Sequence, residues 1–499
     1  MTTRPVAFLG IDIGSSELRG GLVTADGRLL GLGRATHEMR VDSVRGWAEQ
    51  DPDAWWAGLI RIARALLARG DIEIAGIAVD GHGPTMTAVD ADGRPVRPAI
   101  TWLDQRAAAE QAELAAGTGL QGWSLGVLPA ALWLERHEPD SAARTAWYLN
   151  TWEAMTLRLT GVARTSLVGE QAWPSPSDLK SLGAPDHRIA DSIPAGSVVG
   201  GLSAVAAGAL RLTAGIPVVA GIVDAFASFH GGRMLEPGDA IDVGGSAGGF
   251  GVYWDHAVTA AGSFSTAAPL PGLYSVGGAM AATGKALDWL RTAVLHGDLD
   301  TDQLIRAAAG VRPGADGLIF LPYLAGERSP IWDPEARGAF VGLTLQHDRA
   351  HLARAVLEAS ALAIRHVAAP ILAAGVEVSA MRVAGGPARS AAWNQIKADV
   401  TGFRVEVPRI VETAVAGSAI LAAVGVGAHP DLRSGIRAMT TIEARLEPDP
   451  ERRAIYHRTY AAYTEIHPAV SPILAAQRAR ERERERDVVP DPALLEVAQ

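Results

Sequence analysis

Two distant segments of this chain share one pattern, a short apolar strand that ends in an aspartate followed by glycine and serine. The first reads Ile11-Asp12-Ile13-Gly14-Ser15-Ser16, and the second reads Ile241-Asp242-Val243-Gly244-Gly245-Ser246. In each case a second apolar run follows the turn, which is typical of a β-hairpin. Because the order of parts repeats, the chain is expected to fold as two similar α/β halves that arose by duplication.

A second set of matching segments supports this interpretation. In each half an amphipathic helix leads into an apolar strand that ends in glycines. The segments are helix 55–69, strand 74–79 and glycines 81 and 83 in the first half, and helix 351–366, strand 381–384 and glycines 385–386 in the second. Gly-rich turns also recur by chance, so the shared order of parts carries the argument.

The length of 499 residues is more than one hydrophobic core usually supports, so two domains are expected, with a ligand between them. Glycine and proline pairs at 231–232 and 237–238 bracket a polar link between the halves. We therefore expect domains at 1–234 and 235–447 and a C-terminal tail at 448–499. The sequence predicts a helix over 442–478, followed by an Arg/Glu alternation to which we assign no chemistry.

Composition excludes several kinds of protein. A formal net charge of −10 argues against nucleic-acid binding, and the lack of cysteine excludes disulfides, thiolate catalysis and Cys-ligated metals. The N-terminus reads as a first strand without a cleavage site for a secretion signal. No run approaches the roughly 18 continuous apolar residues that a bilayer requires. We therefore expect no membrane partner and a cytoplasmic protein.

The first Asp-Gly-Ser turn has the groups that bind a phosphate together with a divalent cation. The backbone N–H groups of Gly14, Ser15 and Ser16 could approach phosphate oxygens, while Asp12 holds Mg²⁺. Arg19 would add a positive charge. The alternative is a tight hairpin whose side chains cap their own backbone.

Asp224 follows the apolar run 216–223 and precedes an expected helix over 225–230. A carboxylate at this place could accept the proton of an attacking hydroxyl during phosphoryl transfer. The alternative is a helix N-cap.

Three further turns carry polar groups that suit a nucleotide or a sugar. The turn that contains Gly386 and Ser390 could lie against a nucleotide. His82 could hydrogen-bond a substrate hydroxyl, although a histidine in a turn is often structural. Trp102 and Asp104 place an aromatic face beside an acid, as sugar sites do, and an ordinary ion pair with Arg106 explains the acid equally well.

The most specific stretch of the chain runs from Leu321 to Pro334, LPYLAGERSPIWDP, and continues through Arg337 to Thr344. Shorter characteristic runs lie at 49–55, 100–106, 158–161 and 412–419. With these segments the chain resembles the FGGY family of carbohydrate kinases from about residue 8 to residue 427. The long stretch resembles the C-terminal signature of that family, and the shorter runs agree with it in order. The resemblance implies two ribonuclease-H-like domains of the actin/hexokinase ATPase type, with the active site in the cleft between them.

The resemblance also implies roles for individual residues. Asp224 matches the catalytic base and Asp12 the acid near Mg²⁺, with ATP as the phosphoryl donor. The positions that match ATP and phosphate sites are Gly14, Ser15, Ser16, Arg19, Gly245, Ser246, Gly284, Asp288, Gly386 and Ser390. The positions expected to contact the substrate are His82, Gly83, Trp102, Asp104 and Asp224. Gly245 departs from the family, which usually has threonine there.

The substrate implied is a small sugar or polyol, and the chain is most similar to the xylulokinases. Two departures leave the substrate open: Gly83-Pro84 replaces a Met-His pair, and Ala225 follows the base where an asparagine is usual. D-xylulose is therefore the first expectation, with ribulose, an erythritol-like polyol and gluconate as alternatives. A non-catalytic, ATP-dependent sugar sensor on the same fold is the rival class. A homodimer is compatible with the family, although no interface can be read from the sequence.

Overall fold

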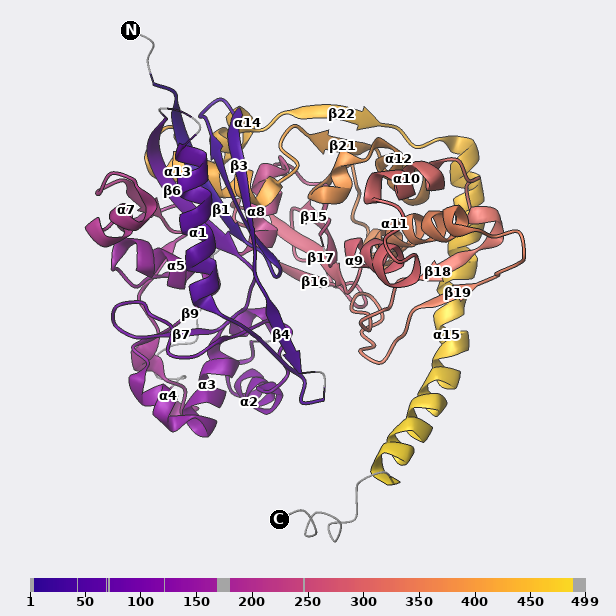
Figure 1. Cartoon of the computed structure of the whole chain (residues 1–499), viewed down its shortest axis with the longest axis horizontal. Coiled ribbons are helices and arrows are strands. Elements are labelled where there is room, and N and C mark those ends of the chain that lie inside the picture. Colours follow the sequence, from indigo (N-terminus) through magenta and orange to yellow (C-terminus); the bar gives the residue numbers. More distant parts are fainter. Residues whose placement is uncertain are drawn as a thin grey trace.

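The computed structural model describes residues 4–487 except 43, 69, 71, 121, 168–179 and 246. Two large mixed β-sheets lie side by side, one in each half of the chain (Figure 1). The first has the order β12 (Val198–Gly201), β13 (Pro217–Val219), β6 (Glu73–Gly81), β1 (Val6–Ile13), β2 (Glu17–Val23), β3 (Leu29–Thr36). The second has the order β16 (Phe264–Ala267), β17 (Tyr274–Met280), β15 (Gly248–Trp254), β14 (Asp239–Asp242), β20 (Ala380–Val383), β21 (Val405–Pro408), β22 (Ile442–Leu446).

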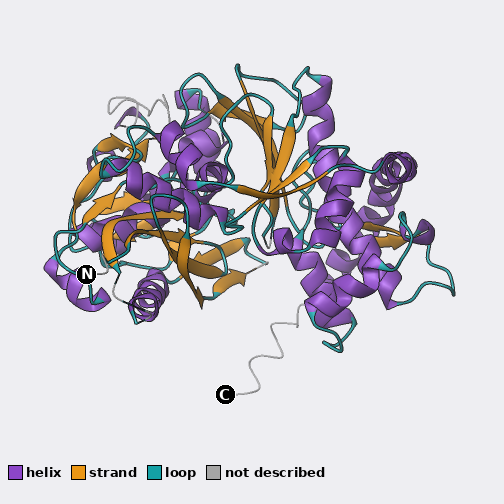
Figure 2. Cartoon of the chain, turned by 90° about the horizontal axis from the view of Figure 1, so that it is seen from above, coloured by secondary structure: helices purple, strands orange, loops and turns teal. Residues whose placement is uncertain are grey.

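Helices pack around both sheets, and short sheets extend the halves (Figure 2). The helices of the first half are α1 (Pro52–Leu67), α2 (Ala108–Thr118), α3 (Leu128–His137), α4 (Pro139–Arg144), α5 (Thr151–Thr160), α7 (Ala204–Leu210) and α8 (Asp224–Gly231). Those of the second are α9 (Gly284–Trp289), α10 (Thr301–Ala309), α11 (Arg349–Ala373), α12 (Ala391–Thr401), α13 (Thr413–Gly425), α14 (Leu432–Met439) and α15 (Pro450–Asp487). The short sheets are β4 (Met39–Asp42) with β5 (Trp47–Gln50) and β8 (Ala99–Ile100), β7 (Thr87–Val89) with β9 (Trp147–Leu149), β10 (Thr165–Leu167) with β11 (Ser192–Pro194), and β18 (Ile319–Leu321) with β19 (Ala339–Val341).

The strand order confirms the predicted duplication. In the first sheet β1 pairs antiparallel with β2 and parallel with β6, which in turn pairs parallel with β13. In the second sheet β14 has the same relation to β15 and β20, and β20 to β21. Asp12 and Asp242 therefore occupy equivalent ends of equivalent strands. The domain boundaries at 234/235 and 447/448 stay a prediction.

Helix α13 belongs to the second half in sequence but packs against β1 and α8 of the first half (Figure 1). Glycines make this close approach possible. A Cβ on Gly417 of α13 would lie 1.9 Å from the Ala227 carbonyl oxygen, and one on Gly10 of β1 would lie 2.1 Å from the Val415 carbonyl oxygen. The two halves therefore contact each other there through backbone atoms.

Helix α11 forms the centre of the second half. It is the one described helix long and apolar enough to cross a membrane, but 72% of its most apolar stretch is buried inside the protein. Its charged residues Arg354 and Glu358 are also buried, and they pair at 2.6 Å. The pattern is that of a core helix.

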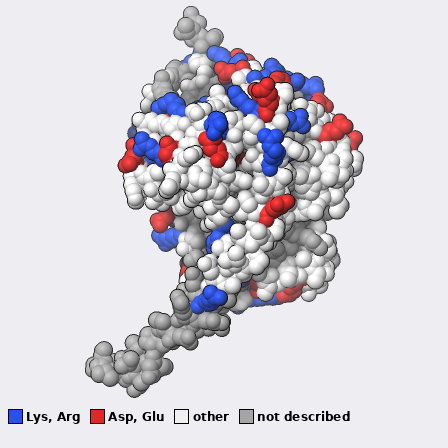
Figure 3. Space-filling model, turned by 90° about the vertical axis from the view of Figure 1, so that its right-hand side faces the viewer, with Lys and Arg blue, Asp and Glu red and all other residues white. Residues whose placement is uncertain are grey.

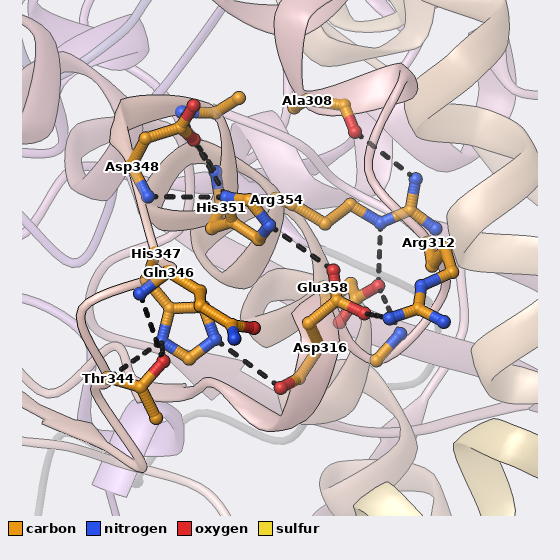
Figure 4. Close-up of polar contacts among 12 residues, drawn as sticks. Ala308, Arg312, Asp316, Thr344, Gln346, His347, Asp348, His351, Arg354 and Glu358 are labelled. Atoms are coloured by element: carbon orange, nitrogen blue, oxygen red, sulfur yellow. Dashed lines mark hydrogen bonds and ion pairs between the residues drawn. The ribbon is translucent and has the colours of Figure 1, made fainter.

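The expected helix over 442–478 begins later than predicted. Residues 442–446 form β22, an edge strand beside β21, and α15 begins at Pro450. Helix α15 then packs on the second half, where the Tyr456 hydroxyl donates to Glu358 at 2.7 Å and accepts from Arg354. Figure 4 shows Arg354 and Glu358 within the polar network at the start of α11. The prediction of a helical tail is confirmed as far as residue 487.

Charge on the described surface agrees with the composition. On the face of the second half that Figure 3 shows, lysine and arginine side chains are interspersed with aspartate and glutamate and separated by wide uncharged areas. This face therefore carries charges of both signs rather than a patch of one sign.

Candidate active site

The first predicted phosphate loop, Gly14 to Ser16, joins β1 to β2 and is partly exposed. Gly14 N donates to the Glu17 carbonyl oxygen at 3.0 Å, which closes the turn. Gln50 Nε2 donates to the Ser15 carbonyl oxygen, and Trp102 Nε1 donates to Ser15 Oγ at 3.3 Å. The loop is thus held by Gln50 and by Trp102, which is one of the positions expected to contact the substrate.

Asp12 lies buried near the end of β1, directly below this loop. Arg19 on β2 approaches it with an Nη1 to Oδ2 distance of 3.1 Å and also pairs with Glu17 at 2.9 Å. Burial raises the pKa of Asp12, although the Arg19 charge opposes this. Arg19 is therefore shared between two carboxylates.

Asp224 is the first residue of α8 and is partly exposed. The N-cap is Val223, so the predicted alternative of an N-capping aspartate is not observed; instead Asp224 Oδ1 accepts from the Ala225 N–H at 2.7 Å. Burial, and after it the charge of Asp12, raise the pKa of Asp224 to about 7. A carboxylate with such a pKa is well suited to accept a proton near neutral pH.

In the second half the equivalent aspartate has a different partner. Asp242 is buried at the end of β14, and Lys397 Nζ of α12 lies 2.5 Å from its Oδ2. A cavity of about 10 Å³, room for about one water molecule, lies beside this pair. This cavity is therefore too small for a nucleotide.

These glycine loops pack on one another. The Gly245 carbonyl oxygen accepts from the Gly284 N–H at 3.1 Å, which brings together two predicted nucleotide positions. Gly385 has a φ of 72°, and a Cβ there would lie 1.9 Å from the Gly244 carbonyl oxygen. Ser246 lies outside the described residues.

Of the other predicted nucleotide positions, Gly386 and Ser390 lie at helix starts and Asp288 lies near the end of α9. Gly386 is exposed, and Ser390 caps α12, its Oγ accepting from the Trp393 N–H at 3.2 Å. Asp288 is exposed on α9, with Arg291 at 3.8 Å. Gly386 is free to approach a ligand, whereas the Ser390 hydroxyl already has a helix-capping role.

His82 follows β6 and is fully partnered within the protein. Its Nδ1 contacts Thr85 Oγ1 at 2.8 Å and its Nε2 contacts Gln50 Oε1 at 2.9 Å. Burial lowers the pKa of His82 to about 3, so the ring is neutral. In this arrangement neither nitrogen is free for a sugar hydroxyl, and His82 instead orients Gln50. Gly83 is buried, and a Cβ there would lie 3.0 Å from the Trp152 ring.

Asp104 is one of the positions expected to contact the substrate. Its side chain is fully buried and accepts from Arg106 at 2.8 Å and from the Ala48 N–H at 2.6 Å. The structure shows the ion pair with Arg106, and both Asp104 oxygens accept hydrogen bonds within the protein, so a role in substrate binding stays a prediction. Trp102, in contrast, remains partly exposed.

The structure adds residues from the second half that the sequence did not single out. The Arg328 guanidinium lies over the Trp102 ring, 4.8 Å from its centroid, and donates to the Met280 carbonyl oxygen at 2.7 Å. Glu327 beside it accepts from the Ala281 N–H at 2.7 Å, and burial raises its pKa to about 7. Arg328 of the signature segment, in the second half, thus contacts Trp102, a predicted substrate position in the first half.

Glu412 forms a second link between the halves. It contacts Arg34 of β3 and Arg389 of the nucleotide-side turn. Arg34 in turn pairs with Glu17 at 3.2 Å, the same carboxylate that Arg19 uses. A chain of charges therefore connects the first phosphate loop with the Gly386 turn.

Two sheets that share the order of six strands, with acidic and glycine-rich turns at equivalent strand ends, give the chain the actin/hexokinase ATPase fold of solved sugar kinases. The chain belongs to the FGGY family of carbohydrate kinases: the N-terminal domain model of that family matches residues 7–231 and the C-terminal domain model matches residues 245–426. It is a carbohydrate kinase.

Individual relatives agree with this assignment. The chain is 30% identical to the xylulose kinase of Escherichia coli (strain K12), over 94% of this chain and 100% of that one. It is 30% identical to the solved xylulose kinase from Rhodospirillum rubrum, with a TM-score of 0.76 over 94% of this chain and 100% of that one. The gluconate kinase structure from Lactobacillus acidophilus gives a TM-score of 0.80 at 22% identity, over 93% and 98%, and shows the shared fold alone.

Proposed function

We propose that this kinase transfers the γ-phosphoryl group of ATP, as its Mg²⁺ complex, to a hydroxyl of a ketopentose such as D-xylulose. The observation that carries the proposal is Asp224, a partly exposed carboxylate with a pKa of about 7 at the start of α8. It lies within electrostatic reach of Asp12 and Arg19, which flank the first phosphate loop.

The residues have distinct tasks in this proposal. Asp224 accepts the proton of the sugar hydroxyl, so that the oxygen can attack phosphorus in line with the leaving group. The Gly14 to Ser16 loop and the Gly245 and Gly386 turns offer backbone N–H groups to the phosphates. Asp12 would hold Mg²⁺, which neutralises phosphate charge when bound. Asp288 and Gly284 lie beside the nucleotide.

D-xylulose is the preferred substrate because xylulose kinases of 30% identity cover nearly the whole chain. Ala225 follows the base, and Gly83-Pro84 lies among the positions expected to contact the sugar. These residues offer fewer polar side chains to substrate hydroxyls than the Asn and the Met-His pair that are usual in xylulokinases. Ribulose, an erythritol-like polyol and gluconate are therefore the alternatives. We place the enzyme in the cytoplasm, without a nucleic-acid or membrane partner, and regard a homodimer as compatible with the family.

A coupled ADP-release assay tests the proposal. Purified enzyme with MgATP is offered ketoses, polyols and aldonates in turn. We expect D-xylulose to stimulate ADP release most strongly, with phosphorylated product detected by mass spectrometry. If only another sugar stimulates ADP release, that sugar replaces D-xylulose as the proposed substrate. If no compound stimulates ADP release, the non-catalytic sugar sensor becomes the favoured interpretation.

The pH profile should follow Asp224. A base works only when ionised, and its raised pKa means that protonation begins near pH 7. We therefore expect kcat/KM for the sugar to fall about tenfold per pH unit below about 7 and to be flat above it. Initial rates between pH 5.5 and 9 at saturating MgATP measure this. A profile that stays flat down to pH 5.5 contradicts the assignment of the base.

Trp102 and Arg328 should control sugar affinity. A cation over an aromatic ring contributes about 1 kcal/mol when it is partly shielded from water. We expect Arg328→Met and Trp102→Ala each to raise KM for the sugar about fivefold, with KM for ATP changed less than twofold. Trp102→Phe, which keeps a ring under Arg328, is the matched control. Equal changes in both KM values would indicate a general structural defect instead.

A further inference from the structure

Asp80 is a buried carboxyl group to which the sequence and the family assignment give no role. It lies on β6, and its Cα pairs in register with that of Asp12 on the neighbouring parallel strand β1. Its exposed fraction is 0%, and its oxygen Oδ2 accepts from Ser418 Oγ of α13 at 2.5 Å. The other oxygen, Oδ1, receives no hydrogen bond from the described part of the chain.

The Asp80 and Asp12 side chains also lie on the same face of the sheet, because residues in register on neighbouring strands point the same way and are about 4.8 Å apart. Both are buried. Two buried carboxyl groups this close cannot both be ionised unless a cation lies near them. Arg19 reaches Asp12 but is shared with Glu17.

At the equivalent strand end of the second half, the negative charge is balanced by a positive one. There Asp242 pairs in register with Val383 of β20, so the equivalent of Asp80 is apolar. The single carboxylate is neutralised by Lys397 at 2.5 Å. At the same place the first half has two carboxyl groups and one cation, Arg19, which also pairs with Glu17, so it holds one carboxyl group more than its counterpart.

We infer that Asp80 is a second carboxylate for the divalent cation of the kinase reaction, acting together with Asp12. This rests on the proposed function, which requires MgATP. The donor set fits, because Mg²⁺ in phosphoryl-transfer sites is held by one or two carboxylates, with substrate phosphates and water completing its shell. No group of three or more His, Asp or Glu side chains among the described residues is arranged to hold a metal, so the inferred site has two protein carboxylates.

Ser418 gives the arrangement a further consequence. Its hydroxyl comes from α13 and donates to one Asp80 oxygen, while the other receives no hydrogen bond from the described residues. Helix α13 of the second half therefore positions a metal-site carboxylate of the first half. Ser418 is a positioning residue, because it touches Asp80 and not the cation.

Metal binding to the nucleotide-free enzyme tests this inference without any sugar or turnover. Mn²⁺ alone, followed by electron paramagnetic resonance, reports bound against free cation. We expect Asp80→Asn to weaken Mn²⁺ binding about tenfold or more, and Asp12→Asn to do the same. Glu153→Gln is the matched control, because Glu153 is another fully buried carboxyl whose burial raises its pKa to about 7, in a helix-capping role. It should bind Mn²⁺ as the wild type does.

Thermal unfolding separates a metal role from misfolding. Mg²⁺ should raise the melting temperature of the wild type and of Glu153→Gln but not of Asp80→Asn, whose metal-free melting temperature should be no lower than that of the wild type. Equal Mn²⁺ affinity of the wild type and Asp80→Asn, or no Mn²⁺ binding by the wild type, overturns the inference. So does an Asp80→Asn enzyme with normal metal binding and only a raised KM for the sugar. Failure of all sugars as substrates, with metal binding altered as expected, would instead contradict the proposed function.

Discussion

Asp224→Asn should lower kcat about 10²- to 10⁴-fold while KM for ATP stays within about twofold, because general base catalysis is typically worth that much and Asn cannot accept the proton. Single-turnover phosphorylation of D-xylulose measures the chemical step directly. The variant should remain folded, and its unfolding temperature at pH 8 should be higher than that of the wild type. The reason is the raised pKa: burial favours the protonated form, so the ionised carboxylate destabilises the folded protein above pH 7 and a neutral amide does not.

Two outcomes would contradict the role of Asp224. A variant that keeps more than one-tenth of the wild-type kcat has another base. A variant that loses activity together with its stability and its ATP affinity has a structural defect. Asp224→Glu is a useful companion, because it retains the carboxylate and displaces it by one methylene, so a partial loss of rate is expected.

Lys397→Met should destabilise the protein by about 3–5 kcal/mol, the usual consequence of removing one partner of a buried ion pair. Asp242 would remain buried without its 2.5 Å partner. Chemical denaturation followed by circular dichroism measures the shift. The double variant Asp242→Asn/Lys397→Met should recover most of the loss, since no charge is then left unpaired. An unchanged midpoint in the single variant would mean that water reaches Asp242 and compensates its charge.

Much of the fold follows from patterns that are local in sequence. The apolar run, turn and second apolar run from residue 6 onward form β1, β2 and β3, and the glycine-ended strand before His82 forms β6. Repetition of this order sufficed to predict two similar sheets. The strand β22 was missed although Ile442-Glu-Ala-Arg-Leu alternates apolar and charged residues, which indicates an edge strand. Because these residues lie just before the long helix α15 in the sequence, the predicted helix was extended over them.

Site residues could be predicted where a single turn contains the reactive groups, and could not be predicted where segments distant in sequence meet. Asp12 was predicted because it lies at the end of an apolar strand, and Asp224 because it lies between an apolar run and a helix. Asp80 carries the same signal as Asp12, an aspartate at the end of an apolar strand before glycine, and could have been found by it. Arg328 over Trp102 could not, because 226 positions separate them and only the tertiary fold brings a cation of one half onto a ring of the other.

The backbone contact of α13 with β1 and α8 restricts how the halves can move. With Gly417 against Ala227 and Gly10 against Val415, no flexible side chain separates the two parts at this end. Close-packed backbones do not slide past one another, so this end behaves as the fixed axis of a hinge. Opening must then be greatest away from α13, where only Arg328 and Trp102 join the halves in the contacts described above. A small rotation about such an axis admits a sugar at one edge while the aspartates of β1 and β6, close to the axis, hardly change position.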